Sequence, residues 1–116
     1  MPLSEHDPAY LWDMREAALH ILDFIRGVSF SKYSANKMIQ SAVERQLEIL
    51  GEAARRVSPE YQEEHPEIAW RSIIGLRNIL AHEYGEVKAD RIWRIASVDA
   101  ADIIRQLDPL IPPIDE

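Results

Sequence analysis

The first part of the chain alternates hydrophobic and polar positions with a helical period. Apolar side chains recur there at intervals of three and four residues: Leu11, Met14, Ala18, Ile21, Leu22 and Ile25. Charged residues mostly take the opposite face, which is typical of an amphipathic helix packed on a core. Asp7 followed by Pro8 suits a helix start, with Asp7 as the N-cap, and Gly27 suits its end. The pattern predicts a helix over about residues 8–27.

The same period predicts three further long helices and one short helix. Their ranges are about 35–57, 59–65 for the short helix, 70–84, and from 88 or 90 to 107. Residues 29–34 are expected to be a polar connection. Pro66 should stop the short helix, because the residue before a proline is disfavoured in helical conformation. Gly85 should cap the end of the helix before it.

These elements predict one all-α domain over residues 1–116, an antiparallel bundle of four main helices with a short connecting helix and a proline-rich tail at 108–116. Gly51 and Gly75 lie inside predicted helices, where glycine costs about 1 kcal/mol relative to alanine. They indicate close approach of another backbone or a bend, and a tolerated glycine on an exposed face stays open. Trp12, Trp70 and Trp93 are expected in the core.

Composition argues against several classes of protein. The 116 residues carry 13 Lys and Arg against 20 Asp and Glu, a net charge of −7, and no cysteine. The acidity argues against a protein that coats nucleic acid broadly, because phosphate binding depends on clustered Lys and Arg. Without cysteine there is no disulfide and no Cys-based zinc site. No apolar run reaches the roughly 20 residues of a membrane span, and a cytoplasmic location is expected.

Three polar groups of chemical interest lie in residues 76–85, namely Arg77, His82 and Tyr84. Histidine can take and return a proton near neutral pH, and arginine can bind a phosphate through two hydrogen bonds. Together they suit metal-free RNA cleavage, in which the ribose 2′-hydroxyl attacks the neighbouring phosphate. Arg77 and His82 would lie about 140° apart on an ideal helix. They therefore converge only if the helix unwinds near His82 or a second subunit completes the site.

A purely structural alternative remains for this segment: His82 is favoured by the helix dipole at the C-terminal end of the helix, and Arg77 is paired to an acidic residue. A second set, Glu44, Glu48 and Glu52, is spaced by four residues. We interpret it as a solvated acidic stripe, because no Glu-x-x-His motif accompanies it as in di-metal bundles. No metal and no cofactor are expected. Arg45, on the same predicted helix, can face the same site as Arg77.

The remaining histidines, His6, His20 and His65, show no partner at ligand spacing, and we expect them at the surface.

Three stretches carry a family resemblance: AVERQLEILGEA over residues 42–53, PEIAW over 66–70 and IGLRNILAH over 74–82. In this order and spacing, the chain from about Trp12 to Leu107 resembles the HepT-like branch of the HEPN superfamily, the helical proteins of HepT–MntA toxin–antitoxin pairs. The R-x4-H-x-Y motif of that family is intact as Arg77, His82 and Tyr84.

The resemblance implies a metal-independent ribonuclease toxin that acts on RNA as a homodimer, with the Arg and His of both subunits meeting across a two-fold interface. His82 would be the acid–base group and Arg77 the stabiliser of the phosphate and transition state, with Asn78 orienting the site. Tyr84 matches the tyrosine to which the partner antitoxin, an MntA-like nucleotidyltransferase, transfers AMP. AMP would add bulk and negative charge beside Arg77.

A different class stays open. The protein can instead be a helical interaction or nucleotide-binding module, an accessory subunit of a small nucleotidyltransferase without activity of its own. Intact Arg77 and His82 favour the nuclease. Residues 71–94 contain five Lys and Arg against three Asp and Glu. The acidic chain therefore contains a confined basic region around the candidate residues.

Overall fold

Two long helices, α1 (Asp7–Ile25) and α3 (Lys37–Arg56), pack side by side and form the centre of the protein. The computed structural model describes residues 6–112. The inward stripe of α1 and that of α3 are buried as the periodicity predicts, including Met14, Ile21, Leu47 and Leu50, each 0% exposed. Burial of such side chains, at about 1.5–3 kcal/mol each, is the main force that holds the two helices together.

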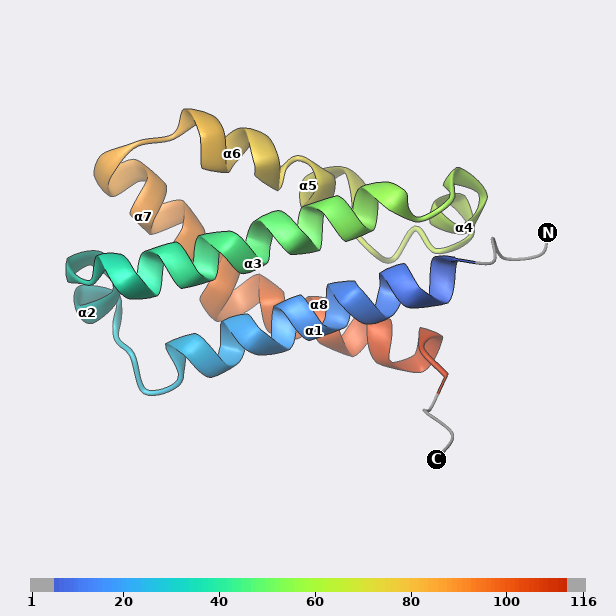
Figure 1. Ribbon diagram of the computed structural model, residues 1–116, viewed down its shortest axis with the longest axis horizontal. Coiled ribbons are helices and arrows are strands. Elements are labelled where there is room, and N and C mark those ends of the chain that lie inside the picture. Colours follow the sequence, from blue (N-terminus) through green and yellow to red (C-terminus); the bar gives the residue numbers. More distant parts are fainter. Residues whose placement is uncertain (1–5, 113–116) are drawn as a thin grey trace.

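The rest of the chain covers this pair on two sides (Figure 1). α5 (Trp70–Ile74) and α6 (Leu76–His82) pack on α3, and α8 (Ala100–Leu107) packs on α1. α7 (Gly85–Arg94) leads from the end of α6 back across the molecule, and the π-helical turn Ile95–Asp99 joins it to α8. Successive long segments run in opposite directions, so the predicted all-α antiparallel bundle is confirmed.

Two short helices connect α1 to α3 and α3 to α5. α4 (Pro59–Glu64) is the predicted short helix, capped by the Ser58 side chain. α2 (Phe30–Ala35) lies where we expected a polar connection. Its Ser29 side chain accepts a hydrogen bond from the Lys32 N–H, and Tyr33 is fully buried against the Trp93 ring. A six-residue segment is too short to show a period, so only its contact with α7 reveals the helix.

Several element boundaries differ from the predicted ones. The helix predicted over 70–84 is broken at Gly75 and ends at His82, and Gly85 begins α7 instead of capping a helix. The last helix starts earlier than predicted and contains the π turn, in which the Ser97 hydroxyl donates to the Trp93 carbonyl at 2.6 Å. Of the tail, Asp108–Leu110 forms a 3-10 turn and residues 113–116 lie outside the described range.

Asp7 does not cap α1 as predicted. Its carboxylate is fully buried and accepts hydrogen bonds from the backbone N–H and the hydroxyl of Ser58, at 2.9 and 2.6 Å. Ser58 also caps α4, so Asp7 ties the start of α1 to the link between α3 and α4. The start of the chain is thereby fixed to residues more than fifty positions away.

Trp70 is buried and Trp93 partly buried, as predicted for core residues, whereas Trp12 is 38% exposed. His6 and His20 are at the surface, and His65 is partly buried against the Tyr61 ring. Within residues 6–112, no helix is long and apolar enough to cross a membrane.

Candidate active site on helix α6

The position of α6 depends on two glycines. Gly51 of α3 lies directly beneath α5, where a Cβ atom would come within 3.1 Å of the Ile73 carbonyl oxygen. This is the close backbone approach that the sequence suggested for Gly51. Gly75 separates α5 from α6, and a Cβ atom there would come within 3.1 Å of the Arg71 carbonyl oxygen. Gly75 therefore marks the bend, the other outcome predicted for these two residues.

α6 packs on the protein through three apolar side chains and presents polar ones outward. Leu76, Ile79 and Leu80 face inward, and Arg77, Asn78 and His82 are exposed. Arg77 and His82 lie on opposite flanks, because five residues correspond to a rotation of about 140°. Ala81, which is also exposed, lies between them. The outer face of α6 therefore has a small residue at its centre and polar groups at both edges.

Arg77 lines a hollow of about 550 Å³ between α1, α3 and the α5–α6 segment, which we call the Arg77 hollow. Arg45 lines the same hollow, so the structure brings the two arginines to one hollow, as expected if they serve one site. The remaining charged side chains of the hollow come from α1 and α3: Asp13, Glu48, Glu52, Arg55 and Arg56. Four arginines against three carboxylates leave the Arg77 hollow positive.

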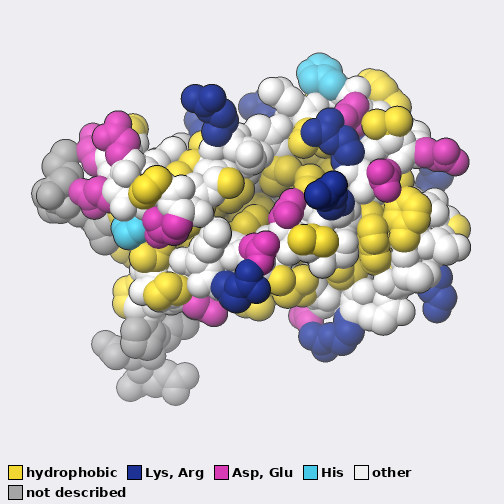
Figure 2. All heavy atoms as spheres, turned by 180° about the vertical axis from the view of Figure 1, so that it is seen from behind, with side chains coloured by type: hydrophobic (Ala, Val, Ile, Leu, Met, Phe, Trp, Pro, Cys, Tyr) yellow, Lys and Arg dark blue, Asp and Glu magenta, His cyan; other side chains and the backbone are white. Residues whose placement is uncertain are grey.

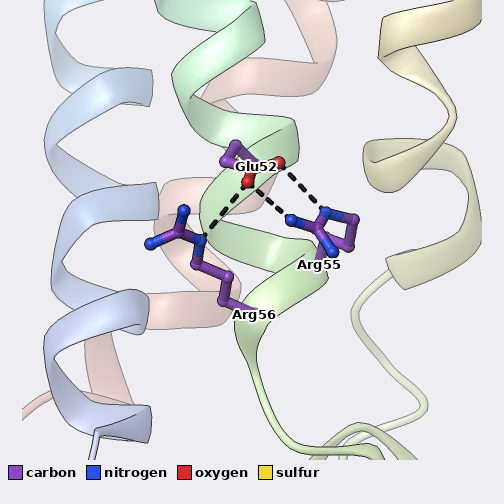
Figure 3. A network of polar contacts seen from close by, with 3 residues as sticks. All are labelled: Glu52, Arg55 and Arg56. Atoms are coloured by element: carbon purple, nitrogen blue, oxygen red, sulfur yellow. Dashed lines mark hydrogen bonds and ion pairs between the residues drawn. The ribbon is translucent and has the colours of Figure 1, made fainter.

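The three glutamates of the predicted acidic stripe, Glu44, Glu48 and Glu52, are partly exposed, and each of them also pairs with a cation. Glu52 accepts hydrogen bonds from Arg55, at 3.0 and 2.7 Å, and from Arg56 at 3.3 Å (Figure 3). These two guanidinium groups lower the pKa of Glu52 to about 2. Glu48 pairs with Arg45 at 3.6 Å, and Glu44 pairs with Lys88 of α7 at 3.0 Å.

Arg77 has no side-chain hydrogen bond or ion pair with any residue in the described range 6–112, and the same holds for His82. The alternative in which Arg77 is paired to an acid is therefore not what the structure shows. A free guanidinium and a free imidazole at the surface are available to a ligand or to a second protein chain.

His82 lies in a different, shallower hollow of about 400 Å³, which we call the His82 hollow. Asn78, Ile79, Glu83 and Arg91 line it as well. Arg91 projects from α7 and forms an ion pair with Glu83, the residue that follows His82. Sequence reasoning counted Arg91 only as local positive charge, because a residue nine positions from His82 and beyond Gly85 has no helical relationship to it.

Tyr84 lies between α6 and α7, in a short extended link. Its side chain is 77% exposed, and its hydroxyl lies 3.5 Å from the Ala81 carbonyl oxygen. The backbone of Tyr84 is extended, and Gly85 follows with a φ of 62°, a conformation that favours glycine. This link reverses the direction of the chain between α6 and α7, and it leaves Tyr84 exposed to solvent.

A cleft of about 530 Å³, which we call the apolar cleft for its floor, lies between the α5–α6 segment, the end of α7 with the π turn, and α8. Its charged lining residues are Arg91, Asp99 and Asp102. Its apolar lining includes Ile73, Leu76, Ile79, Ile95 and Ile103. Figure 2 shows hydrophobic side chains at the floor of a recess on this face, with Lys or Arg side chains beside it. Ile79 and Arg91 border both the apolar cleft and the His82 hollow, so the two are neighbours.

Within one chain, the structure thus brings Arg77 together with Arg45, and His82 together with Asn78, but separates the two groups by the width of α6. Convergence of Arg77 and His82 in a single chain is not observed, although α6 ends at His82. The second condition set by the sequence, completion by another subunit, remains.

Comparison with known proteins places the chain in a family. The sequence model described as "Ribonuclease HepT-like" matches residues 14–110. A Methanocaldococcus jannaschii protein named "Putative RNase" is 35% identical over 100 residues, covering 86% of this chain and 92% of that protein. "Probable ribonuclease HepT" of Thermococcus cleftensis is 34% identical over 101 residues, covering 87% and 92%. No solved structure gives a significant match.

These matches confirm the resemblance seen in the three sequence stretches, and they span all the elements that form the candidate site. The chain belongs to the HepT-like family of the HEPN superfamily.

Proposed function

We propose that this protein is a metal-independent endoribonuclease, the toxin of a toxin–antitoxin pair. The family description and the names of the relatives support ribonuclease activity. The observation that carries the proposal is that Arg77 and His82, the two motif residues on α6, are exposed and have no side-chain partner among residues 6–112. If Arg77 and His82 only stabilised the fold, we would expect them to be buried or to form hydrogen bonds or ion pairs with other side chains.

The chemistry follows from the two side chains. Neutral His82 takes the proton of the ribose 2′-hydroxyl as its oxygen attacks the adjacent phosphorus. The bond from phosphorus to the 5′-oxygen breaks, and a protonated imidazole gives a proton to that leaving oxygen. Arg77 binds the phosphate oxygens, where negative charge grows in the transition state. Asn78, beside His82, orients the substrate, and Arg45 adds positive charge beside Arg77.

A homodimer completes this site. If two copies of α6 meet antiparallel across a two-fold axis, Arg77 of one subunit approaches His82 of the other. The small side chain of Ala81 at the centre of the outer face permits the two helices to lie close together. The active site would then combine the Arg77 hollow of one subunit with the His82 hollow of the second.

A nucleotidyltransferase antitoxin of the MntA type would silence the enzyme at Tyr84. The phenol oxygen attacks the α-phosphorus of ATP, the bond to the β-phosphate oxygen breaks, and pyrophosphate and the phenolic proton leave. The exposed side chain of Tyr84 fits such a reaction. The attached AMP adds a negative phosphodiester next to the site where the RNA phosphate binds, and it repels that substrate.

Cleavage of RNA by the purified protein tests the proposal. The wild type is expected to cut single-stranded RNA in the presence of a metal chelator and to leave a 2′,3′-cyclic phosphate. His82→Ala should lower the rate by about 10²–10⁴-fold, the usual contribution of an acid–base group. His20→Ala, an exposed histidine on α1, is the matched control and should keep full activity. Equal cleavage by wild type and His82→Ala, or cleavage by neither, would reject the nuclease in favour of the accessory module.

A further inference from the structure

Arg91 is the only cation among the described residues that line the His82 hollow. The motif arginine, Arg77, lies on the other flank of α6 in another hollow. A single subunit therefore presents His82 with a second positive group that comes from α7 and is outside the R-x4-H-x-Y motif. The Arg91 side chain is 53% exposed, so a ligand can reach its guanidinium.

The position of Arg91 is fixed on two sides. Glu83, at the end of α6, forms an ion pair with it. α7 itself is held to α3 by the 3.0 Å pair between Lys88 and Glu44, one helical turn before Arg91. A guanidinium held in this way loses less conformational entropy on binding an anion than a freely rotating one. Only part of its five N–H donors can be used by one carboxylate.

We propose that Arg91 binds a phosphate of the RNA substrate in the His82 hollow, and this inference rests on the proposed ribonuclease function. Arg91 and His82 then act from one subunit on the same stretch of RNA, whereas Arg77 comes from the second subunit. Because Arg91 also borders the apolar cleft, the nucleotide attached to its phosphate lies at the entrance of that cleft. Arg91 is a substrate-binding residue in this arrangement, and His82 remains the acid–base group.

Glu83 provides the means to separate this role from a structural one. Arg91→Gln and Glu83→Gln both break the same ion pair, but only Arg91→Gln removes the cation. If the ion pair merely stabilises the turn between α6 and α7, both variants should behave alike. If Arg91 binds phosphate, Glu83→Gln should bind RNA at least as tightly as the wild type, because a carboxylate next to the phosphate has been removed.

RNA affinity is measured by fluorescence anisotropy with a labelled single-stranded RNA of mixed sequence, in the full chain carrying His82→Ala so that the probe stays intact. Arg91→Gln should bind about tenfold more weakly, the effect of losing one charge-assisted contact. The slope of log affinity against log salt should fall by about 0.7, as expected for one phosphate contact to a single strand. Arg91→Lys should recover part of the affinity.

Arg26→Gln is the matched control, because Arg26 is an exposed arginine of an Arg–Asp ion pair at the far end of α1. It should leave both affinity and salt slope unchanged. With His82 intact, Arg91→Gln should lower kcat/KM for RNA cleavage mainly through KM. Circular dichroism and the melting temperature show that each variant is folded.

The outcomes separate the two proposals. If the wild type cleaves RNA and His82→Ala does not, but Arg91→Gln matches Arg26→Gln in affinity and salt slope, the role of Arg91 is overturned and the nuclease stands. Equal losses in Arg91→Gln and Glu83→Gln would also overturn it, as a structural effect of the ion pair. Absence of cleavage by the wild type would overturn the proposed function itself.

Discussion

Arg77 and His82 lie on opposite flanks of α6 and open into different hollows of the same chain. An α-helix turns by about 100° per residue, so two side chains five positions apart cannot meet on one face. The family motif is therefore split by the geometry of the helix that carries it. Under the proposed ribonuclease function, a second subunit must therefore supply one of its two parts to a shared substrate.

This separation predicts that two inactive variants restore each other. Arg77→Ala and His82→Ala are each expected to be inactive as homodimers. After the two are unfolded and refolded together in equal amounts, half of the dimers are mixed, and each mixed dimer has one complete site of two. RNA cleavage should return to about a quarter of the wild-type rate. No recovery, with mixed dimers shown by mass spectrometry, would place the site within one chain.

Modification of Tyr84 is expected because this tyrosine is exposed. Incubation with the nucleotidyltransferase partner and ATP should add one or more AMP units to the chain, detected by intact-mass spectrometry, and should stop RNA cleavage. Tyr84→Phe should show no mass increase. Tyr10→Phe, a change at a partly buried tyrosine of α1, should be modified like the wild type. Modification that persists in Tyr84→Phe would contradict the assignment.

Asp7 is expected to contribute strongly to stability. Asp7→Ala leaves the Ser58 N–H without its buried acceptor and should lower the free energy of unfolding by about 2–3 kcal/mol. Asp13→Ala, at an exposed position of the same helix, should change it by about 0.5 kcal/mol or less. Urea unfolding of both variants checks this. Similar small losses for the two would show that the tie from α1 to Ser58 is not a stabilising contact.

Gly51→Ala should destabilise the protein although alanine is the better helix former. Alanine gains about 1 kcal/mol in a helix interior, but its Cβ would lie 3.1 Å from the Ile73 carbonyl oxygen. Such overpacking costs about 1–3 kcal/mol. Ser41→Ala, exposed on the same helix, should instead stabilise slightly. The sign of the change in urea unfolding decides, since stabilisation by Gly51→Ala would exclude a close approach of α3 and α5.

Glu52 should titrate far below an ordinary glutamate. Its pKa is lowered from 4.5 to about 2, chiefly by the hydrogen bond from Arg55. Because the pKa of Glu52 is lower in the folded state than in the unfolded state, its ionisation stabilises the fold at pH values above the unfolded-state pKa. This contribution is lost as the pH falls from about 4.5 toward 2. Carboxyl chemical shifts in NMR should show this, and Arg55→Gln should raise the midpoint. Salt should raise it too, because the pair is partly exposed.

The sequence determined most of the helices and the residues of chemical interest. A stripe that must be buried imposes its period on the chain, so α1 and α3 could be located within a few residues of their bounds. The intact motif singled out Arg77, His82 and Tyr84 as candidates, and the positive charge over residues 71–94 predicts where an acidic protein could bind a phosphate; their roles stay predictions. Gly51 was visible as a helical glycine that required an explanation.

Only the tertiary structure decided how these parts are joined. α2 forms because Tyr33 packs on Trp93, a contact between residues sixty positions apart, and local pattern holds no record of it. Asp7 leaves its expected capping role because Ser58 offers two donors in a buried place. Arg91 reaches the His82 hollow because the link through Tyr84 and Gly85 folds α7 back beside α6. Contacts between residues far apart in the sequence depend on how the helices pack against one another. The hydrophobic period of a helix, in contrast, depends only on residues that are neighbours in the sequence.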